Sequence, residues 1–143
     1  MNTEVKGRIL GVDYGDVRTG LAISDPSGFL ASGIGTYKPG GMRRTAELVA
    51  KEAGEREAVR IVIGLPKNMD GSEGFRADAV KAFAAILAEL TDIPCVFYDE
   101  RLTTAEAHKL LSLTETGGKK RKGVVDTLSA QIILQDYLDS MRR

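Results

Sequence analysis

The sequence has very few of the residues that build disulfides or zinc sites. Its 143 residues include one cysteine, one histidine and no tryptophan. Cys95 lies in the apolar run 93–98, so we expect a small buried side chain, and a single cysteine cannot form an internal disulfide. A zinc site built from histidine and cysteine ligands is therefore not expected.

The chain also lacks an excess of either charge and any long apolar stretch. Lys and Arg total 20, as do Asp and Glu, so any binding of nucleic acid must depend on local patches rather than on net charge. No stretch approaches the roughly 18 apolar residues of a membrane span. Residues 1–6 are polar and lack the apolar core of a signal peptide. We therefore expect a soluble, cytoplasmic protein that does not associate with membranes.

Hydrophobic patterning predicts a single domain, 1–143, of the α/β class. Three β-rich runs joined by short turns predict an antiparallel meander. Two later apolar runs, separated by a helix, predict parallel strands with a right-handed crossover. The expected fold is a mixed five-stranded sheet, a three-strand meander plus two parallel strands, flanked by helices. The expected strands are 8–12, 20–24, 29–37, 59–64 and 94–98, the helices 42–57, 75–90, 103–113 and 124–141, and the long loops 65–74 and 114–123.

Asp13 is a carboxylate at the end of the first predicted strand. A buried carboxylate is costly unless a cation or hydrogen bonds meet it. Asp13 could start a turn through the backbone of Tyr14 and Gly15. It could also belong to a binding site, because ligands gather at strand ends in α/β sheets.

Two more acids, Asp99 and Glu100, directly follow the predicted strand 94–98. Adjacent carboxylates repel each other unless a cation meets one of them, and Arg101 is the nearest cation in the sequence. The pair is therefore explained either by an ion pair or by a functional site.

Asp126 lies in the first turn of the predicted helix 124–141. An acid there is stabilised by the helix dipole. Asp126 nevertheless stands between Val125 and Leu128, which are expected to face the core. Its carboxylate could therefore point toward the sheet.

Asp13, Glu100 and Asp126 could converge, because the first and fifth strand ends would be near each other across the fourth strand. The last helix could lie over them. Three carboxylates without histidine or cysteine form a hard oxygen site suited to Mg²⁺ or Mn²⁺. Carboxylates that hold two ions about 4 Å apart are the arrangement for in-line phosphoryl displacement.

Several basic residues near these strand ends are candidate nucleic-acid ligands. A basic tract could bind the backbone phosphates that the acids repel, although a solvated loop would have the same composition. Arg18 and Lys67 lie on predicted turns that could border the same strand ends, and Arg101 follows the two acids. The basic tract consists of Lys119, Lys120, Arg121 and Lys122.

Four segments together resemble the YqgF family, whose members are also called RuvX-type Holliday junction resolvases or pre-16S rRNA nucleases. They are GVDYGDVRTGLAISD (11–25), IVIGLPKNMDGSEG (61–74), YDERLTTAEA (98–107) and KGVVDTLSAQIILQDYL (122–138). The resemblance covers nearly the whole chain. It implies a ribonuclease H-like fold and a Mg²⁺- or Mn²⁺-dependent endonuclease that matures the 5′ end of pre-16S rRNA. Its partner would be nucleic acid, with the small ribosomal subunit a further candidate, and either a monomer or a homodimer is compatible with the sequence.

The same resemblance assigns the family's acids to positions in this chain. It implies that Asp13, Glu100 and Asp126 are both the catalytic residues and the metal ligands, with Asp99 the alternative to Glu100. Junction-resolving relatives have a further acid about one turn along the last helix, where this chain has Ser129. That difference favours RNA over branched DNA as the substrate.

Three alternative functions stay open at this point. A Holliday junction resolvase would act on branched DNA. A sugar-kinase or actin-like ATPase would share the acid–glycine turn 11–20, but those enzymes close two such cores around the nucleotide and 143 residues supply one. A non-catalytic nucleic-acid-binding factor fits the zero net charge but leaves the clustered acids unexplained.

Overall fold

The computed structural model describes residues 6–102 and 118–142, with side chains described for 6–102 and 127–142. The strands are β1 (Arg8–Asp13), β2 (Thr19–Ser24), β3 (Ala31–Tyr37), β4 (Ala58–Leu65) and β5 (Cys95–Asp99). The helices are α1 (Met42–Glu55), α2 (Phe75–Leu90) and α4 (Gly118–Met141), and a 3₁₀ turn, η1 (Glu100–Leu102), follows β5 directly.

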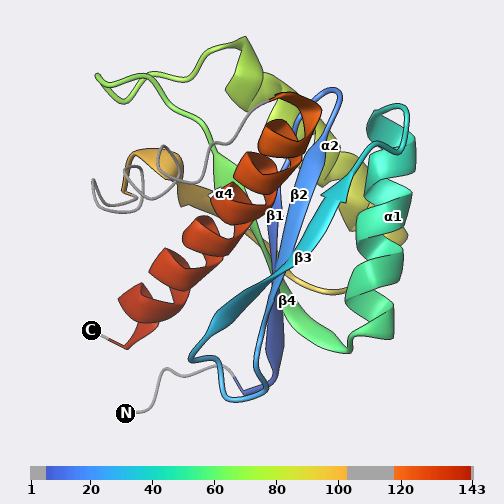
Figure 1. Ribbon diagram of the computed structural model, residues 1–143, viewed down its shortest axis with the longest axis vertical. Helices are drawn as coiled ribbons and strands as arrows, with labels where there is room; N and C mark the ends of the chain where they lie inside the picture. Colours follow the sequence, from blue (N-terminus) through green and yellow to red (C-terminus); the bar gives the residue numbers. More distant parts are fainter. Residues whose placement is uncertain (1–5, 103–117, 143) are drawn as a thin grey trace.

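The five strands form one mixed sheet in the order β3-β2-β1-β4-β5 (Figure 1). The first three strands pair antiparallel, which confirms the predicted meander. Strand β4 pairs parallel with β1 on one side and with β5 on the other. The carboxyl ends of β1, β4 and β5 therefore lie at the same edge of the sheet.

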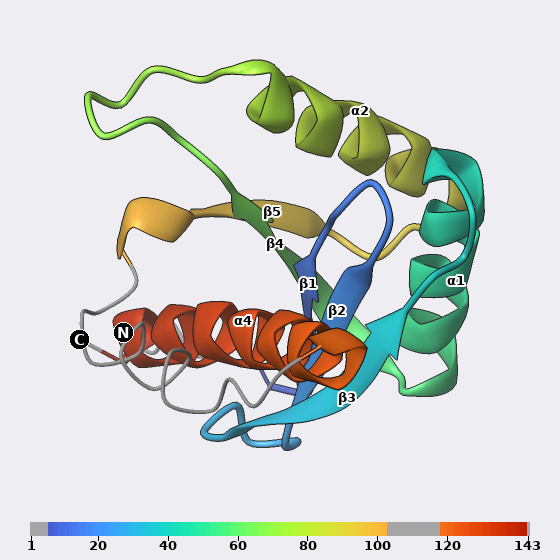
Figure 2. The ribbon, with the colours of Figure 1, turned by 45° about the horizontal axis from the view of Figure 1, so that its top comes forward.

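Helices cover both faces of the sheet, with α1 and α2 on one face and α4 on the other (Figure 2). Alternation along β1 sets the two cores: Leu10 and Val12 pack with α1 and α2, whereas Ile9 faces α4. Gly11 also faces α4, and a Cβ on it would lie 2.8 Å from Cβ of Leu134. A glycine there lets α4 approach the sheet closely.

Several strand ends differ from the prediction by one residue, and Asp99 ends β5 instead of following it. Two larger differences have local reasons. Strand β3 begins at Ala31 rather than at 29, because the Asp25 carboxylate accepts hydrogen bonds from the amides of Phe29 and Leu30 and holds that segment in a turn. Helix α1 ends at Glu55 rather than at 57. Glu57 has a φ of 56°, a left-handed conformation that cannot continue a helix.

The start of the last helix is the larger error. Helix α4 begins at Gly118, so the prediction of a loop up to residue 123 was wrong for 118–123. Lysine and arginine are good helix formers, and the basic tract extends the helix rather than preceding it. The predicted helix 103–113, with His108, lies outside the described residues. Among the helices that are described, none is long and apolar enough to cross a membrane.

Candidate active site

Asp13 is the last residue of β1, at the sheet edge where β1, β4 and β5 end. The β1–β4 pairing runs up to Val12 opposite Ile63, so Asp13 and Gly64 are the next residues on two neighbouring strands. Asp13 follows Ile9 and Gly11 in the alternation of β1 and therefore belongs to the face of the sheet that α4 covers. The structure thus places Asp13 beside a position without a side chain.

Glu100 occupies the space that a side chain at Gly64 would fill. A Cβ on Gly64 would lie 3.2 Å from Cγ and 3.3 Å from Cδ of Glu100. It would also lie 2.7 Å from Cδ1 of Ile133, which places this contact on the α4 face. Glu100 reaches this position because η1 turns the chain back immediately after β5. The Asp13 and Glu100 carboxylates therefore come to the same face and the same edge, on either side of the β4 end.

Asp99 has a different environment from Glu100. Its carboxylate forms an ion pair with the Arg101 guanidinium, with 2.8 Å between Oδ2 and Nη2, and accepts the Arg101 backbone amide at 2.9 Å. The hydrogen bond from the Arg101 side chain holds the pKa of Asp99 below its ordinary value, and Lys67 adds a smaller effect. By alternation with Tyr98, which packs on the α4 side, Asp99 belongs to the opposite face of the sheet.

Helix α4 passes over the strand that ends in Asp13. The backbone oxygen of Ala130 lies 3.2 Å from the Cβ that a side chain on Gly11 would have. Position 126 is one turn before Ala130 on the helix, but the side chain of Asp126 lies outside the described ones. Ser129, which is partly buried, stands one turn before Ile133. Among the described side chains, no three His, Cys, Asp or Glu residues are grouped so that they could hold a metal ion together.

The predicted nucleic-acid ligands that the structure describes lie at this same edge. Arg18 is in the β1–β2 turn and Lys67 in the segment after β4. Lys67 lies 3.8 Å from Glu73. Arg101, in addition to pairing with Asp99, donates a hydrogen bond to the carbonyl oxygen of Met69 at 3.3 Å. The basic tract 119–122 lies in the first turns of α4, and its side chains are outside the described ones.

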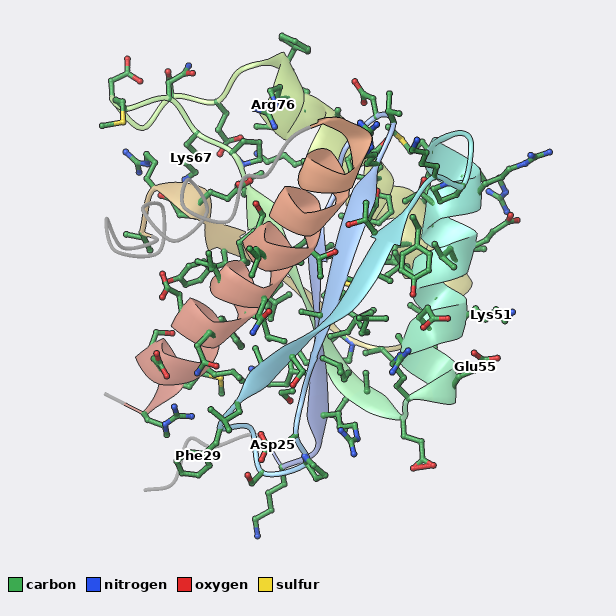
Figure 3. The ribbon with its side chains drawn as sticks, viewed as in Figure 1. Asp25, Phe29, Lys51, Glu55, Lys67 and Arg76 are labelled. Carbon is green, nitrogen blue, oxygen red and sulfur yellow. The ribbon has the colours of Figure 1, made fainter. Side chains whose placement is uncertain are left out.

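Two features of this edge were not assigned by sequence reasoning. The first is Gly64, which leaves the space that the Glu100 side chain fills. Arg76, in the first turn of α2, joins Lys67 at the same end of the molecule (Figure 3). The sequence did offer a signal for Arg76. A cation in the first turn of a helix is unfavourable because of the helix dipole, so its presence there suggests a role in binding.

The fold places the molecule in a class of known proteins. The chain superposes on "T. thermophilus RuvC in complex with Holliday junction substrate" with a TM-score of 0.60 and 12% sequence identity, over 94% of this chain and 96% of that one. A second structure of Thermus thermophilus RuvC gives 0.56 and 12%, over 93% and 96%. The mixed sheet with its flanking helices is therefore the ribonuclease H-like fold of RuvC-type resolvases.

Sequence similarity narrows the class to a family. The family model described as "RuvX: Holliday junction resolvase" matches residues 7–140. Relatives from Thermoanaerobacter pseudethanolicus and Listeria monocytogenes serotype 4b are each 43% identical, over 94% and 93% of this chain and 98% of each relative. Both relatives carry the name "Putative pre-16S rRNA nuclease". The chain belongs to the RuvX family, which confirms the resemblance found in its motifs.

Proposed function

We propose that this protein is a metal-dependent endonuclease that hydrolyses phosphodiester bonds and acts in maturation of the 5′ end of pre-16S rRNA. The observation that carries the proposal is the position of Glu100. Its side chain lies against Gly64, the neighbour of Asp13, so two acids from distant parts of the sequence share one sheet edge. A protein that only bound nucleic acid would gain nothing from placing carboxylates together near phosphates.

The donors at this edge fit a hard divalent cation. Asp13 and Glu100 offer carboxylate oxygens, the ligands that Mg²⁺ and Mn²⁺ favour, and the described residues bring neither His nor Cys to this position. We assign Asp13, Glu100 and Asp126 as the ligands, with Asp126 supplied by α4. A bound ion would lower the pKa of an attacking water and offset charge on the phosphate.

The protein's own groups would act by position and charge. Asp13 and Glu100 would orient the attacking water on one side of the phosphorus, and no covalent bond to the enzyme is needed. Water adds to the phosphorus, the bond to the leaving ribose oxygen breaks, and a proton passes to that oxygen. Asp99 forms an ion pair with Arg101. We therefore propose that Asp99 stabilises η1 and takes no part in the reaction.

The substrate is assigned from two considerations. Ser129 stands where the junction-resolving relatives have a further acid, which favours RNA. The relatives at 43% identity also carry an rRNA nuclease name. The family description favours a second candidate, cleavage of a four-way DNA junction. In the proposed role the protein works in the cytoplasm, with the precursor of the small ribosomal subunit as its partner.

One cleavage experiment tests the proposal and separates its two substrates. A labelled pre-16S rRNA fragment that includes the 5′ precursor segment, and a labelled four-way DNA junction, are each incubated with the protein. Each reaction contains Mg²⁺, Mn²⁺ or EDTA, and uses the wild type or Asp13→Asn. We expect cleavage of the RNA with either metal, none with EDTA, and none by Asp13→Asn.

Other outcomes would change the assignment. Metal-dependent cleavage of the junction alone would move the function to branched DNA and make Ser129 a tolerated difference. RNA cleavage that persists in EDTA or in Asp13→Asn would contradict the proposed site. Binding of either substrate without cleavage, in all three metal conditions, would favour a non-catalytic factor.

A further inference from the structure

A cavity of about 270 Å³ lies close to the acids, on the other face of the sheet. It is formed by the β1–β2 turn, by Pro66 directly after β4, and by the first two turns of α2. The turn begins at Tyr14, the residue after Asp13, so the cavity adjoins the edge that carries the candidate active site. Tyr14 packs in the core beneath α1 and α2, whereas Glu100 lies on the α4 side.

The walls of the cavity are mainly apolar and partly aromatic. The Tyr14 ring stacks on the Phe83 ring with 4.5 Å between the ring centroids, and this contact holds the Tyr14 ring in place. Phe75 and Val17, which also line the cavity, are 80% and 64% exposed. Large apolar side chains that are exposed around a cavity are typical of a binding site.

Polar groups at the cavity define what could enter. Asp16 and Arg76 both line it, so it offers a carboxylate acceptor and a guanidinium donor in addition to its apolar walls. The Asp16 carboxylate opposes entry of a phosphate. A flat, uncharged ring with N–H donors and acceptors on its edge matches this combination.

We propose that this cavity, which we call the base pocket, binds one unpaired nucleobase of the RNA substrate. The proposal rests on the proposed function, since the phosphate next to that nucleotide would lie at Asp13 and Glu100. Phe75 supplies an exposed ring for stacking, as aromatic side chains do in single-strand-binding proteins. Arg76 and Asp16 pair with the edge of the base, in the way that single-stranded RNA is read.

The charge distribution supports a nucleic-acid occupant over an apolar peptide side chain. The chain has no net charge, yet Lys67 and Arg76 lie at the same end of the molecule (Figure 3). Arg18 belongs to the turn that forms one wall of the pocket. These cations can contact phosphates on either side of a base held in the pocket. The enzyme would then select RNA with an unpaired nucleotide beside the cleaved bond.

The absence of tryptophan from the sequence makes a direct test possible. Phe75→Trp, made together with Asp13→Asn to prevent cleavage, gives a single tryptophan at the pocket. Phe29→Trp in the same Asp13→Asn protein is the matched control. Phe29 is also an exposed phenylalanine, 52% exposed, at the opposite end of the molecule from Arg76 (Figure 3).

The two proteins are titrated with single-stranded RNA from the 5′ precursor segment and with a blunt duplex of the same sequence. Stacking of a base quenches tryptophan fluorescence. We expect the single strand to quench the tryptophan of Phe75→Trp and not that of Phe29→Trp, and we expect less quenching with the duplex. In parallel, Phe75→Ala in the Asp13→Asn protein should bind the single strand roughly fivefold to 150-fold more weakly than the Asp13→Asn protein itself, the range for loss of a base stack. Phe29→Ala in the same protein should bind normally.

The outcomes distinguish failure of the base pocket from failure of the proposed function. If the wild type cleaves RNA but Phe75→Trp is not quenched and Phe75→Ala binds normally, the base pocket is refuted and the nuclease stands. If Phe75→Trp is quenched but the wild type cleaves no RNA with either metal, the base pocket stands and the nuclease is refuted. If none of the proteins binds RNA, both are overturned.

Discussion

Gly64 decides where the Glu100 carboxylate can lie. The glycine is buried near the end of β4, and Glu100 and Ile133 both lie in the space beside it on the α4 side of the sheet. Any larger residue would compete with Glu100 for that space. At the scale of single residues, the candidate site therefore depends on the glycine at position 64 as much as on its acids.

The substitution Gly64→Ala tests this dependence. The added methyl group would meet Glu100 at 3.2 Å and Ile133 at 2.7 Å. Crowding of this kind in a packed region costs about 1–3 kcal/mol. We expect urea unfolding to show a loss of stability in that range, and RNA cleavage to need a higher Mg²⁺ concentration because Glu100 is displaced.

Gly54→Ala is the control for that substitution. Nothing lies within 4 Å of a Cβ on Gly54, which is inside helix α1. Alanine should stabilise the helix by roughly 0.5–1 kcal/mol and leave the Mg²⁺ requirement unchanged. If Gly64→Ala were as stable and as active as the wild type, Glu100 would not be held where the structure places it.

At the scale of elements, the β2–β3 turn shows how one acid fixes the start of a strand. The Asp25 carboxylate accepts a hydrogen bond from the Ser27 hydroxyl and from the amides of Phe29 and Leu30, at 2.7 and 2.9 Å. These hydrogen bonds hold the pKa of Asp25 well below its ordinary value of 3.8. The turn therefore depends on the ionised carboxylate.

A pH dependence follows for Asp25→Asn. A depressed pKa in the folded state stabilises the fold above the ordinary pKa, and this stabilisation is lost as the pH falls below 3.8 toward the folded value. The variant should therefore be less stable than the wild type at pH 7, and the difference should shrink at pH 3. Urea unfolding at the two pH values measures it. Asp92→Asn, at another exposed acid, should show a smaller difference at pH 7; equal differences for both variants would contradict the role of the turn.

The sequence predicted most of the elements because each carries its own periodicity. Short apolar runs and turn residues identified all five strands and the crossover between the last two. That the first and fifth strands could come near each other across the fourth was a hypothesis, and the structure places β4 between β1 and β5. The start of α4 was missed because residues 118–123 include no apolar side chain. Helix-forming lysines without an apolar stripe look the same as a solvated loop.

The choice between Asp99 and Glu100 could not be made from the residues alone. The two acids are adjacent, so a one-residue shift in the register of β5 would exchange their faces. In the structure, Asp99 ends β5 and pairs with Arg101, whereas Glu100 begins η1 and lies against Gly64. The family resemblance favoured Glu100, and the geometry is consistent with that choice.

At the scale of the whole molecule, the zero net charge makes nucleic-acid binding depend on where the cations lie. Counterion release gives single-stranded binding a salt slope of roughly −0.7 per phosphate contacted. Replacement of Lys119, Lys120, Arg121 and Lys122 by glutamine should therefore flatten the plot of log affinity against log salt by up to about three units. Binding of labelled RNA by the Asp13→Asn protein between low and high salt measures the slope. An unchanged slope would show that the basic tract contacts no phosphate.

In the proposed site, Asp13 and Glu100 form the reactive edge and Asp99 does not take part. The most direct measurement is the rate of RNA cleavage at saturating Mg²⁺ by Glu100→Gln and by Asp99→Asn, with urea unfolding to verify that both are folded. Glu100→Gln should lose at least roughly a hundredfold in rate, since even the supporting partners of metal ligands are worth 10- to 100-fold, while Asp99→Asn should stay within about tenfold of the wild type. A folded Glu100→Gln protein that cleaves normally, beside an inactive Asp99→Asn, would show that Asp99 and not Glu100 is the reactive acid.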